Sequence, residues 1–152
     1  MKARDYFEEL VLVEHDLRRA REMLDVAEDR VDGVGGSAPL PTRGGGASPD
    51  GVLGRLMAVD RAKRRWADRL DELCAREDEA WEVIAAVRPP NPRAAASWRS
   101  CLQERYLMCK SYAEVSEAVG MSVSGVRYSI DSALDWIDAQ GGPLALIRVG
   151  CV

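Results

Sequence analysis

The side chains best suited to binding a ligand lie in one short stretch, which contains Ser122, Val123, Ser124, Gly125, Arg127 and Tyr128. A guanidinium such as that of Arg127 can hold two acceptor atoms of a guanine base at once. The Ser124 hydroxyl can reach a phosphate oxygen or a base edge, and Tyr128 can pack on a sugar-phosphate backbone. The chemistry that this stretch offers is recognition of nucleic acid.

Residue types that support catalysis or hold metals are scarce. The only histidine is His15, on a predicted helix, where a surface position is expected. The four cysteines form no C-x-x-C pair and are expected to be reduced thiols; they are Cys74, Cys101, Cys109 and Cys151. The glycine-rich stretch contains no G-x-x-x-x-G-K-[ST] phosphate loop. The sequence therefore predicts no enzyme activity, no metal site and no cofactor.

Charge is distributed unevenly along the 152 residues, whose net charge is −4. Residues 1–32 hold six Lys and Arg against ten Asp and Glu, whereas residues 88–152 hold seven against six. The C-terminal part is therefore close to neutral, although a phosphate-binding domain usually carries more positive charge. We find no signal peptide and no apolar run of membrane-spanning length, so a cytoplasmic protein without a membrane partner is expected.

Two short helices joined by a glycine turn must position the nucleic-acid-binding side chains. Ser111 and Glu114 form a capping box, which predicts a helix over residues 112–119, and Gly120 can take the left-handed conformation that ends it. Ser122 then caps a second helix. The second helix is expected to bury Val126, Ile130, Ala133, Leu134 and Ile137. This is a helix-turn-helix, in which the first turns of the second helix enter the major groove.

A long helical hairpin is predicted before this unit. Apolar residues recur at alternating spacings of three and four from Leu10 to Val31 and again from Val52 to Val87, as in the seam of a coiled coil. The two helices are expected over about residues 3–31 and 49–87, joined by a loop rich in Gly and Pro at 32–50. The predicted fold class is all-α, with this antiparallel, coiled-coil-like hairpin preceding a small trihelical domain.

Three segments follow from this pattern. Residues 1–88 form the hairpin, which we expect to mediate oligomerisation, and the prolines between Arg88 and Pro92 mark a boundary. Residues 91–139 form the helix-turn-helix domain, beginning with a helix over 92–109. Residues 140–152 are an apolar tail, expected to pack on the domain or on a partner, with a short strand at an interface as one option.

The C-terminal third resembles sigma-70 region 4. The resemblance rests on Leu102-Gln-Glu-Arg-Tyr-Leu107, on Ser111-Tyr-Ala-Glu-Val-Ser-Glu-Ala-Val-Gly-Met-Ser122, and on Val126-Arg127 with Ala133-Leu134. The chain departs from that family at Ser116, where Ala is usual, and at Gly125, where Thr is common. The hairpin before the domain also resembles phage late-gene regulators of the ArpU/RinA type. Nothing resembles sigma region 2, so a complete sigma factor is not expected.

These resemblances imply a sequence-specific transcriptional regulator, derived from a phage or prophage, that binds double-stranded DNA as a homo-oligomer, most simply a dimer. Two alternatives stay open. A small terminase subunit for DNA packaging also joins a helix-turn-helix to coiled-coil helices. A protein-binding adaptor could instead dock its trihelical unit on RNA polymerase, which region-4 domains contact.

Overall fold

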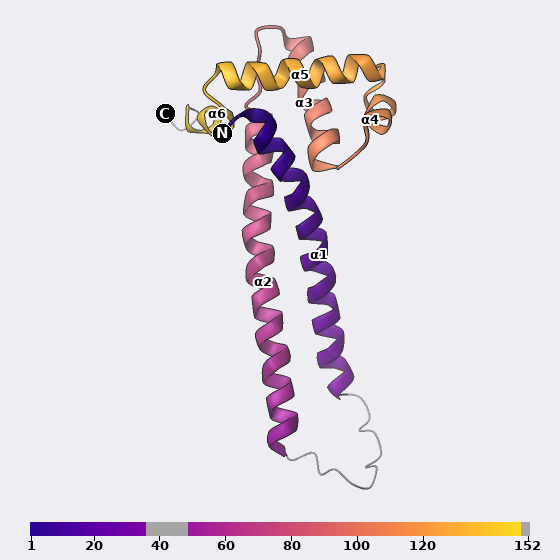
Figure 1. Ribbon diagram of the computed structural model, residues 1–152, viewed down its shortest axis with the longest axis vertical. Helices are drawn as coiled ribbons and strands as arrows, with labels where there is room; N and C mark the ends of the chain where they lie inside the picture. Colours follow the sequence, from indigo (N-terminus) through magenta and orange to yellow (C-terminus); the bar gives the residue numbers. More distant parts are fainter. Residues whose placement is uncertain (36–48, 150–152) are drawn as a thin grey trace. The chain divides into compact units, whose positions relative to one another are not determined.

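The computed structural model describes residues 1–35 and 49–149, and every regular element in these residues is a helix (Figure 1). The helices are α1 (Ala3–Gly35), α2 (Pro49–Ala85), α3 (Pro92–Leu102), a π-helical turn η1 (Gln103–Leu107), α4 (Tyr112–Val119), α5 (Val123–Ala139) and α6 (Pro143–Val149). The predicted all-α class is confirmed. Most of the predicted loop at 32–50 lies outside the described residues, as does Cys151.

By their contacts the residues divide into two compact units. The larger unit contains Met1–His15 and Cys74–Val152, and the smaller contains Asp16–Leu73. The beginning of α1 and the end of α2 therefore belong with the C-terminal helices. The prolines suggested a boundary between Arg88 and Pro92, but the contacts do not divide the chain there. The end of α2 and the helices after Pro92 contact one another and belong to one unit, although prolines separate them along the backbone.

Within each unit, α1 and α2 run antiparallel. Polar contacts join Tyr6 to Glu79 (3.0 Å) and Glu9 to Arg76 (3.6 Å) in the larger unit, and Asp16 to Arg69 (3.6 Å) and Glu28 to Lys63 (3.7 Å) in the smaller. In these contacting pairs, higher residue numbers in α1 go with lower residue numbers in α2, as the predicted hairpin requires.

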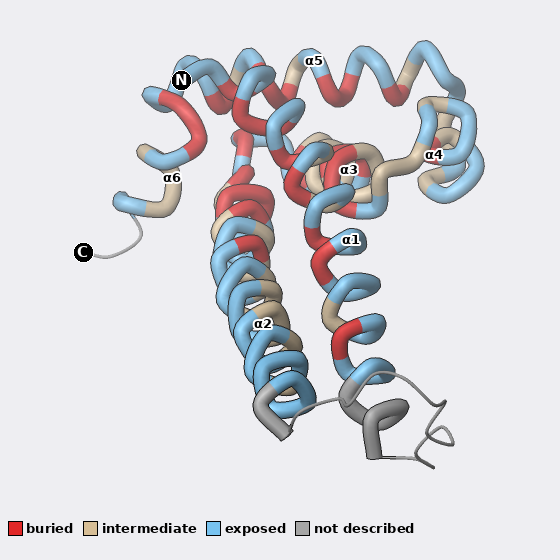
Figure 2. Tube along the Cα trace, turned by 60° about the horizontal axis from the view of Figure 1, so that its bottom comes forward, coloured by how far each residue is buried: buried red, intermediate tan, exposed pale blue. Residues whose placement is uncertain are grey.

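The predicted seam is buried more completely in α1 than in α2 (Figure 2). The buried α1 residues include Leu10, Val13, Leu17, Ala20 and Ala27. In α2, Leu73, Ala80 and Ile84 are buried, as is Val87 just beyond its end, whereas Leu56, Val59, Trp66 and Leu70 are only half-buried. Two helices alone cannot enclose a core, which explains why the α2 seam in the smaller unit keeps one side in solvent.

The first turns of α1 supply part of the core of the larger unit. Phe7 is fully buried, and its ring centroid lies 5.1 Å from that of Tyr106. Tyr6 meets the edge of Phe7 at 5.3 Å between centroids. Aromatic pairs at this separation add to the stabilisation that burial of their area provides. The N-terminal helix therefore stabilises the unit that contains the helix-turn-helix.

The helix predicted over 92–109 is interrupted, which corrects that prediction. It is α-helical only to Leu102 and continues as the π-helical turn η1, where the amide of Met108 donates to the carbonyl of Gln103 at 3.0 Å. The buried residues here are Cys101, Leu102, Tyr106 and Leu107, two adjacent pairs that repeat every five residues. A turn with hydrogen bonds five residues apart brings both pairs to the same side, whereas a regular α-helix does not.

From Pro143 to Val149 the C-terminal tail is helical rather than a strand, which corrects the second option considered for it. Gly141 and Gly142 have φ of +97° and +100°, a conformation that glycine adopts readily, and they reverse the chain after α5. Pro143 then begins α6 at the position where its fixed φ suits a helix. This local start signal decides the conformation of the segment from Pro143 to Val149.

Burial raises the pKa of Tyr106 from 10.0 to about 12. Between these pH values the unfolded chain releases the phenolic proton while the folded chain retains it. The contribution of Tyr106 to the free energy of unfolding should therefore be constant below pH 10 and should fall as pH rises toward 12.

Tyr106→Phe should make the thermal midpoint fall less steeply across this pH range. Burial raises the pKa of Tyr6 as well, so part of the slope should remain. Identical slopes in parent and variant would contradict the assignment to Tyr106.

Candidate functional site

The predicted capping box at the start of α4 is present. The Ser111 hydroxyl accepts from the Glu114 amide at 3.3 Å, and the Ser111 amide donates to the Glu114 carboxylate at 3.0 Å. These two bonds satisfy donors that a helix N-terminus leaves free. At the other end Gly120 adopts φ +74°, and its amide donates to the Ser116 carbonyl at 3.0 Å. Local sequence therefore determines the length of α4.

Gly120→Ala should destabilise the larger unit by about 1–2 kcal/mol, because an L-residue disfavours the left-handed conformation. A Cβ at this position would meet nothing within 4 Å, so the cost comes from the backbone alone. Gly120→Asn is the matched control, since asparagine tolerates this conformation better and should lose less. Thermal unfolding should rank the parent as most stable, Gly120→Asn next and Gly120→Ala last. An equal loss of stability in both variants would contradict this order.

Ser116 and Gly125 each have a local role at the turn between α4 and α5. The Ser116 hydroxyl donates to the Met121 carbonyl, which ties α4 to the turn. Ser122 caps α5 by accepting from the Gly125 amide at 3.1 Å. A Cβ on Gly125 would lie 3.1 Å from the Ser122 hydroxyl oxygen and 3.4 Å from Met121, so the cap leaves little room for a side chain.

Helix α5 has a buried face and an exposed face. The buried residues are Val126, Ser129, Ile130, Ala133, Leu134 and Ile137, which include all five that were predicted. On the other face Ser124 and Arg127 are exposed, Val123 is 39% exposed and Tyr128 is 75% exposed. Of the remaining predicted site residues, Ser122 is exposed and Gly125 is half-buried. Within the described residues, the first turns of α5 present their outer face to solvent.

A cationic cluster that the sequence analysis missed lies beside this face. The guanidinium carbons of Arg105 and Arg127 lie 4.7 and 4.9 Å from the centre of the Tyr112 ring. Arg105 also donates to the Lys110 carbonyl at 2.7 Å. The Lys110 ammonium pairs with Glu104 instead, so we call Arg105, Tyr112 and Arg127 the Tyr112 cluster. An aromatic ring attracts cations over its face, so Tyr112 orders two guanidinium groups at the junction of η1, α4 and α5.

Farther along α5, the outer face carries the carboxylates of Asp131, Asp135 and Asp138. Two of them contact the beginning of α1. Arg4 forms an ion pair with Asp131 at 2.8 Å, and the Ala3 amide donates to Asp138 at 2.7 Å. The outer face of α5 therefore changes from cationic at Arg127 to anionic near its C-terminal end.

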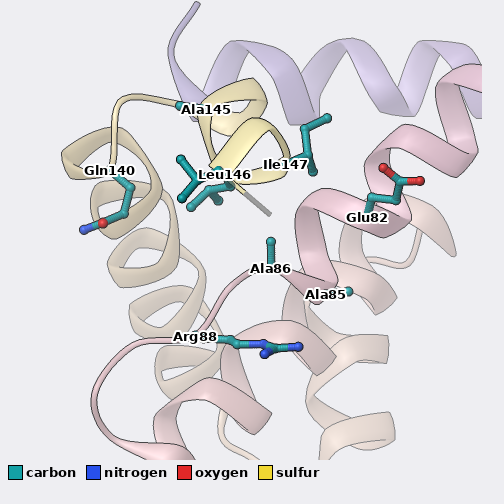
Figure 3. A pocket seen from close by; sticks show the side chains of 9 residues that line it. Glu82, Ala85, Ala86, Arg88, Gln140, Ala145, Leu146 and Ile147 are labelled. Atoms are coloured by element: carbon teal, nitrogen blue, oxygen red, sulfur yellow. The ribbon is translucent and has the colours of Figure 1, made fainter. Parts of the chain in front are cut away.

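A pocket of about 690 Å³ lies elsewhere in the larger unit, between the end of α2 and α6 (Figure 3). Its polar lining comes from Glu82, Arg88 and Gln140, and most of the rest is apolar. Among the described residues no group of three His, Cys, Asp or Glu could hold a metal ion. In residues 1–35 and 49–149, no helix has the length and apolar character to cross a membrane.

Among the described residues Cys74 and Cys101 are free thiols, and the Cys109 thiol donates to the Tyr106 carbonyl at 3.7 Å. Cys101 is fully buried, and burial raises the pKa of its thiol. A buried thiol with a raised pKa is a poor nucleophile, so Cys101 contributes to packing between α3 and α5 rather than to chemistry.

No family model, curated protein or solved structure matches the chain. The relationship to sigma-70 region 4 and to phage late-gene regulators therefore stays a prediction from the residues quoted above.

Proposed function

We propose that the chain is a transcriptional regulator that binds double-stranded DNA sequence-specifically, with α4 and α5 as its helix-turn-helix and α5 as the recognition helix. The observation that carries the proposal is the exposure of Ser124, Arg127 and Tyr128 on the first turns of α5, opposite its buried face. In helix-turn-helix proteins this part of the second helix contacts base edges in the major groove.

Each exposed group has a defined part in this proposal. Arg127 donates to the two major-groove acceptors of a guanine. Ser124 binds a phosphate or a base edge, and Tyr128 packs on the backbone next to it. Val123 and Gly125 line the closest approach of α5 to DNA, while Ser122 holds the helix start through its cap. The positive end of the α5 dipole adds a favourable interaction with phosphate.

The Tyr112 cluster is the source of phosphate contacts. Arg105 and Lys110 are half-exposed and lie on the chain segment just before α4. Arg105 adds a cation to a recognition helix that carries only one arginine, whereas the charge of Lys110 is offset by its ion pair with Glu104. Affinity from one such domain is expected to be low, because salt-dependent binding scales with the number of phosphates contacted. We therefore propose a homodimer that places two copies of α5 on half-sites about 34–36 Å apart.

Selection from a pool of randomised duplexes, followed by fluorescence anisotropy at several salt concentrations, tests the proposal. The full chain should enrich a motif with two half-sites, and the logarithm of its affinity should fall linearly with the logarithm of salt concentration. Scrambling the enriched motif should weaken binding by at least about a thousandfold at physiological salt. Failure to retain any duplex at low salt would overturn DNA binding, and equal retention of motif and scrambled duplexes would overturn specificity.

A further inference from the structure

The Arg4–Asp131 ion pair lies beside the proposed reading surface. Asp131 follows Arg127 by four residues, and residues at this spacing are neighbours on a helix surface. The Arg4 guanidinium contacts the Asp131 carboxylate at 2.8 Å, and both side chains are about half exposed, at 51% and 60%. The beginning of α1 therefore places a cation within about one helical turn of Arg127.

Without Arg4, Asp131 would have another cation within reach. An arginine and an aspartate four residues apart on a helix attract each other, so a released Asp131 would pair with Arg127. That pairing would draw the Arg127 guanidinium away from DNA and would leave a carboxylate facing the phosphates. In the structure Asp131 contacts Arg4, while Arg127 lies over the Tyr112 ring.

The beginning of α1 is held in place independently of this ion pair. The Ala3 amide donates to Asp138 at 2.7 Å, and Phe7 is buried against Tyr106. Arg4 is thus anchored by its neighbours on both sides, so losing its side chain should leave the fold of the larger unit intact.

We propose that Arg4 is a positioning residue for DNA binding: it holds the Asp131 carboxylate and so prevents this carboxylate from pairing with the Arg127 guanidinium that contacts DNA. This inference rests on the proposed function, and it adds the N-terminal turn of α1 to the DNA-binding surface. The role belongs to the Arg4–Asp131 pair, so it disappears when Asp131 carries no charge.

A double-mutant cycle on the full chain tests the proposal, with the duplex recovered by selection as the probe. Arg4→Gln should weaken binding about three- to fivefold, the range expected for loss of one exposed charge pair. Asp131→Asn should bind at least as tightly as the parent. Arg4→Gln introduced together with Asp131→Asn should then weaken binding by less than about twofold relative to Asp131→Asn alone.

Arg148→Gln is the matched control, because it removes the same charge from α6, beyond the C-terminal end of α5. It should change affinity by less than about twofold. Circular dichroism melts of every variant separate loss of binding from loss of folding. The positioning role would be overturned if Arg4→Gln weakened binding equally in the parent chain and in the Asp131→Asn chain. It would also be overturned if the parent bound DNA and Arg4→Gln left its affinity unchanged. Absence of DNA binding by the parent would overturn the proposed function itself.

Discussion

Phe7→Ala is expected to destabilise the larger unit by about 3–5 kcal/mol, the usual range for removing a fully buried aromatic ring. The ring is completely buried between Tyr6 and Tyr106, so its removal leaves a cavity where the beginning of α1 meets η1. Because residues 1–15 belong to the same unit as α5, the loss should extend to the helix-turn-helix. Hydrogen exchange should show lower protection of the α5 amides from Ile130 to Ile137.

Leu12→Ala is the matched control for Phe7→Ala. Leu12 is also an apolar residue of α1 within the larger unit, but its side chain is 65% exposed. Its replacement should change stability by less than about 0.5 kcal/mol and should leave exchange in α5 unchanged. Similar stability and exchange in the two variants would show that the beginning of α1 does not contribute to the core of this unit.

Arg127→Ala should weaken binding to the selected duplex by about 1–3 kcal/mol, which is roughly 5- to 150-fold. The exposed guanidinium is the one group on the first turns of α5 that can hold both major-groove acceptors of a guanine. The side chain is not buried, so the thermal midpoint should change little. Anisotropy with the selected duplex and with a variant duplex that lacks the contacted guanine measures the loss.

Arg127→Lys and Arg148→Ala are the controls for this measurement. A lysine keeps the charge but cannot reproduce the bidentate geometry, so it should preserve salt dependence while discriminating less between the two duplexes. Arg148→Ala removes a cation from α6 and should bind nearly as the parent does. If Arg127→Ala and Arg148→Ala lose equal affinity, Arg127 acts only through its charge and does not read a base.

The helix-turn-helix could be predicted in detail because its signals are local. The capping box of Ser111 and Glu114 and the Ser122 cap each act over three residues, and Gly120 acts through its own φ. Each of these signals can be read from a few neighbouring residue types. The periodicity of α5 identified its buried face for the same reason.

Contacts between distant segments could not be predicted. Phe7 falls outside the apolar seam of α1, and nothing in its neighbourhood indicates that Tyr106 lies against it. The Arg4–Asp131 pair and the stacking of Arg127 on Tyr112 depend in the same way on how helices meet. A single sequence shows the helix propensity of its residues and the periodicity of its apolar positions, whereas such pairs depend on tertiary packing.

The π-helical turn and the half-buried α2 seam show two further limits of pattern analysis. The buried pairs at Cys101–Leu102 and Tyr106–Leu107 have a spacing that a 3.6-residue period does not describe. The α2 seam from Leu56 to Leu70 has the correct period, but the pattern cannot state how much surface covers it. Periodicity indicates the direction of a face and leaves its degree of burial undetermined.

Amide chemical-shift mapping of the isotope-labelled chain, titrated with its selected duplex, tests the central claim most directly. The largest changes should fall on Ser122 to Tyr128 and around Ser111 and Tyr112, while α6 and the smaller unit should change little. Changes confined to α6 or to residues 16–73, with the first turns of α5 unaffected, would contradict it.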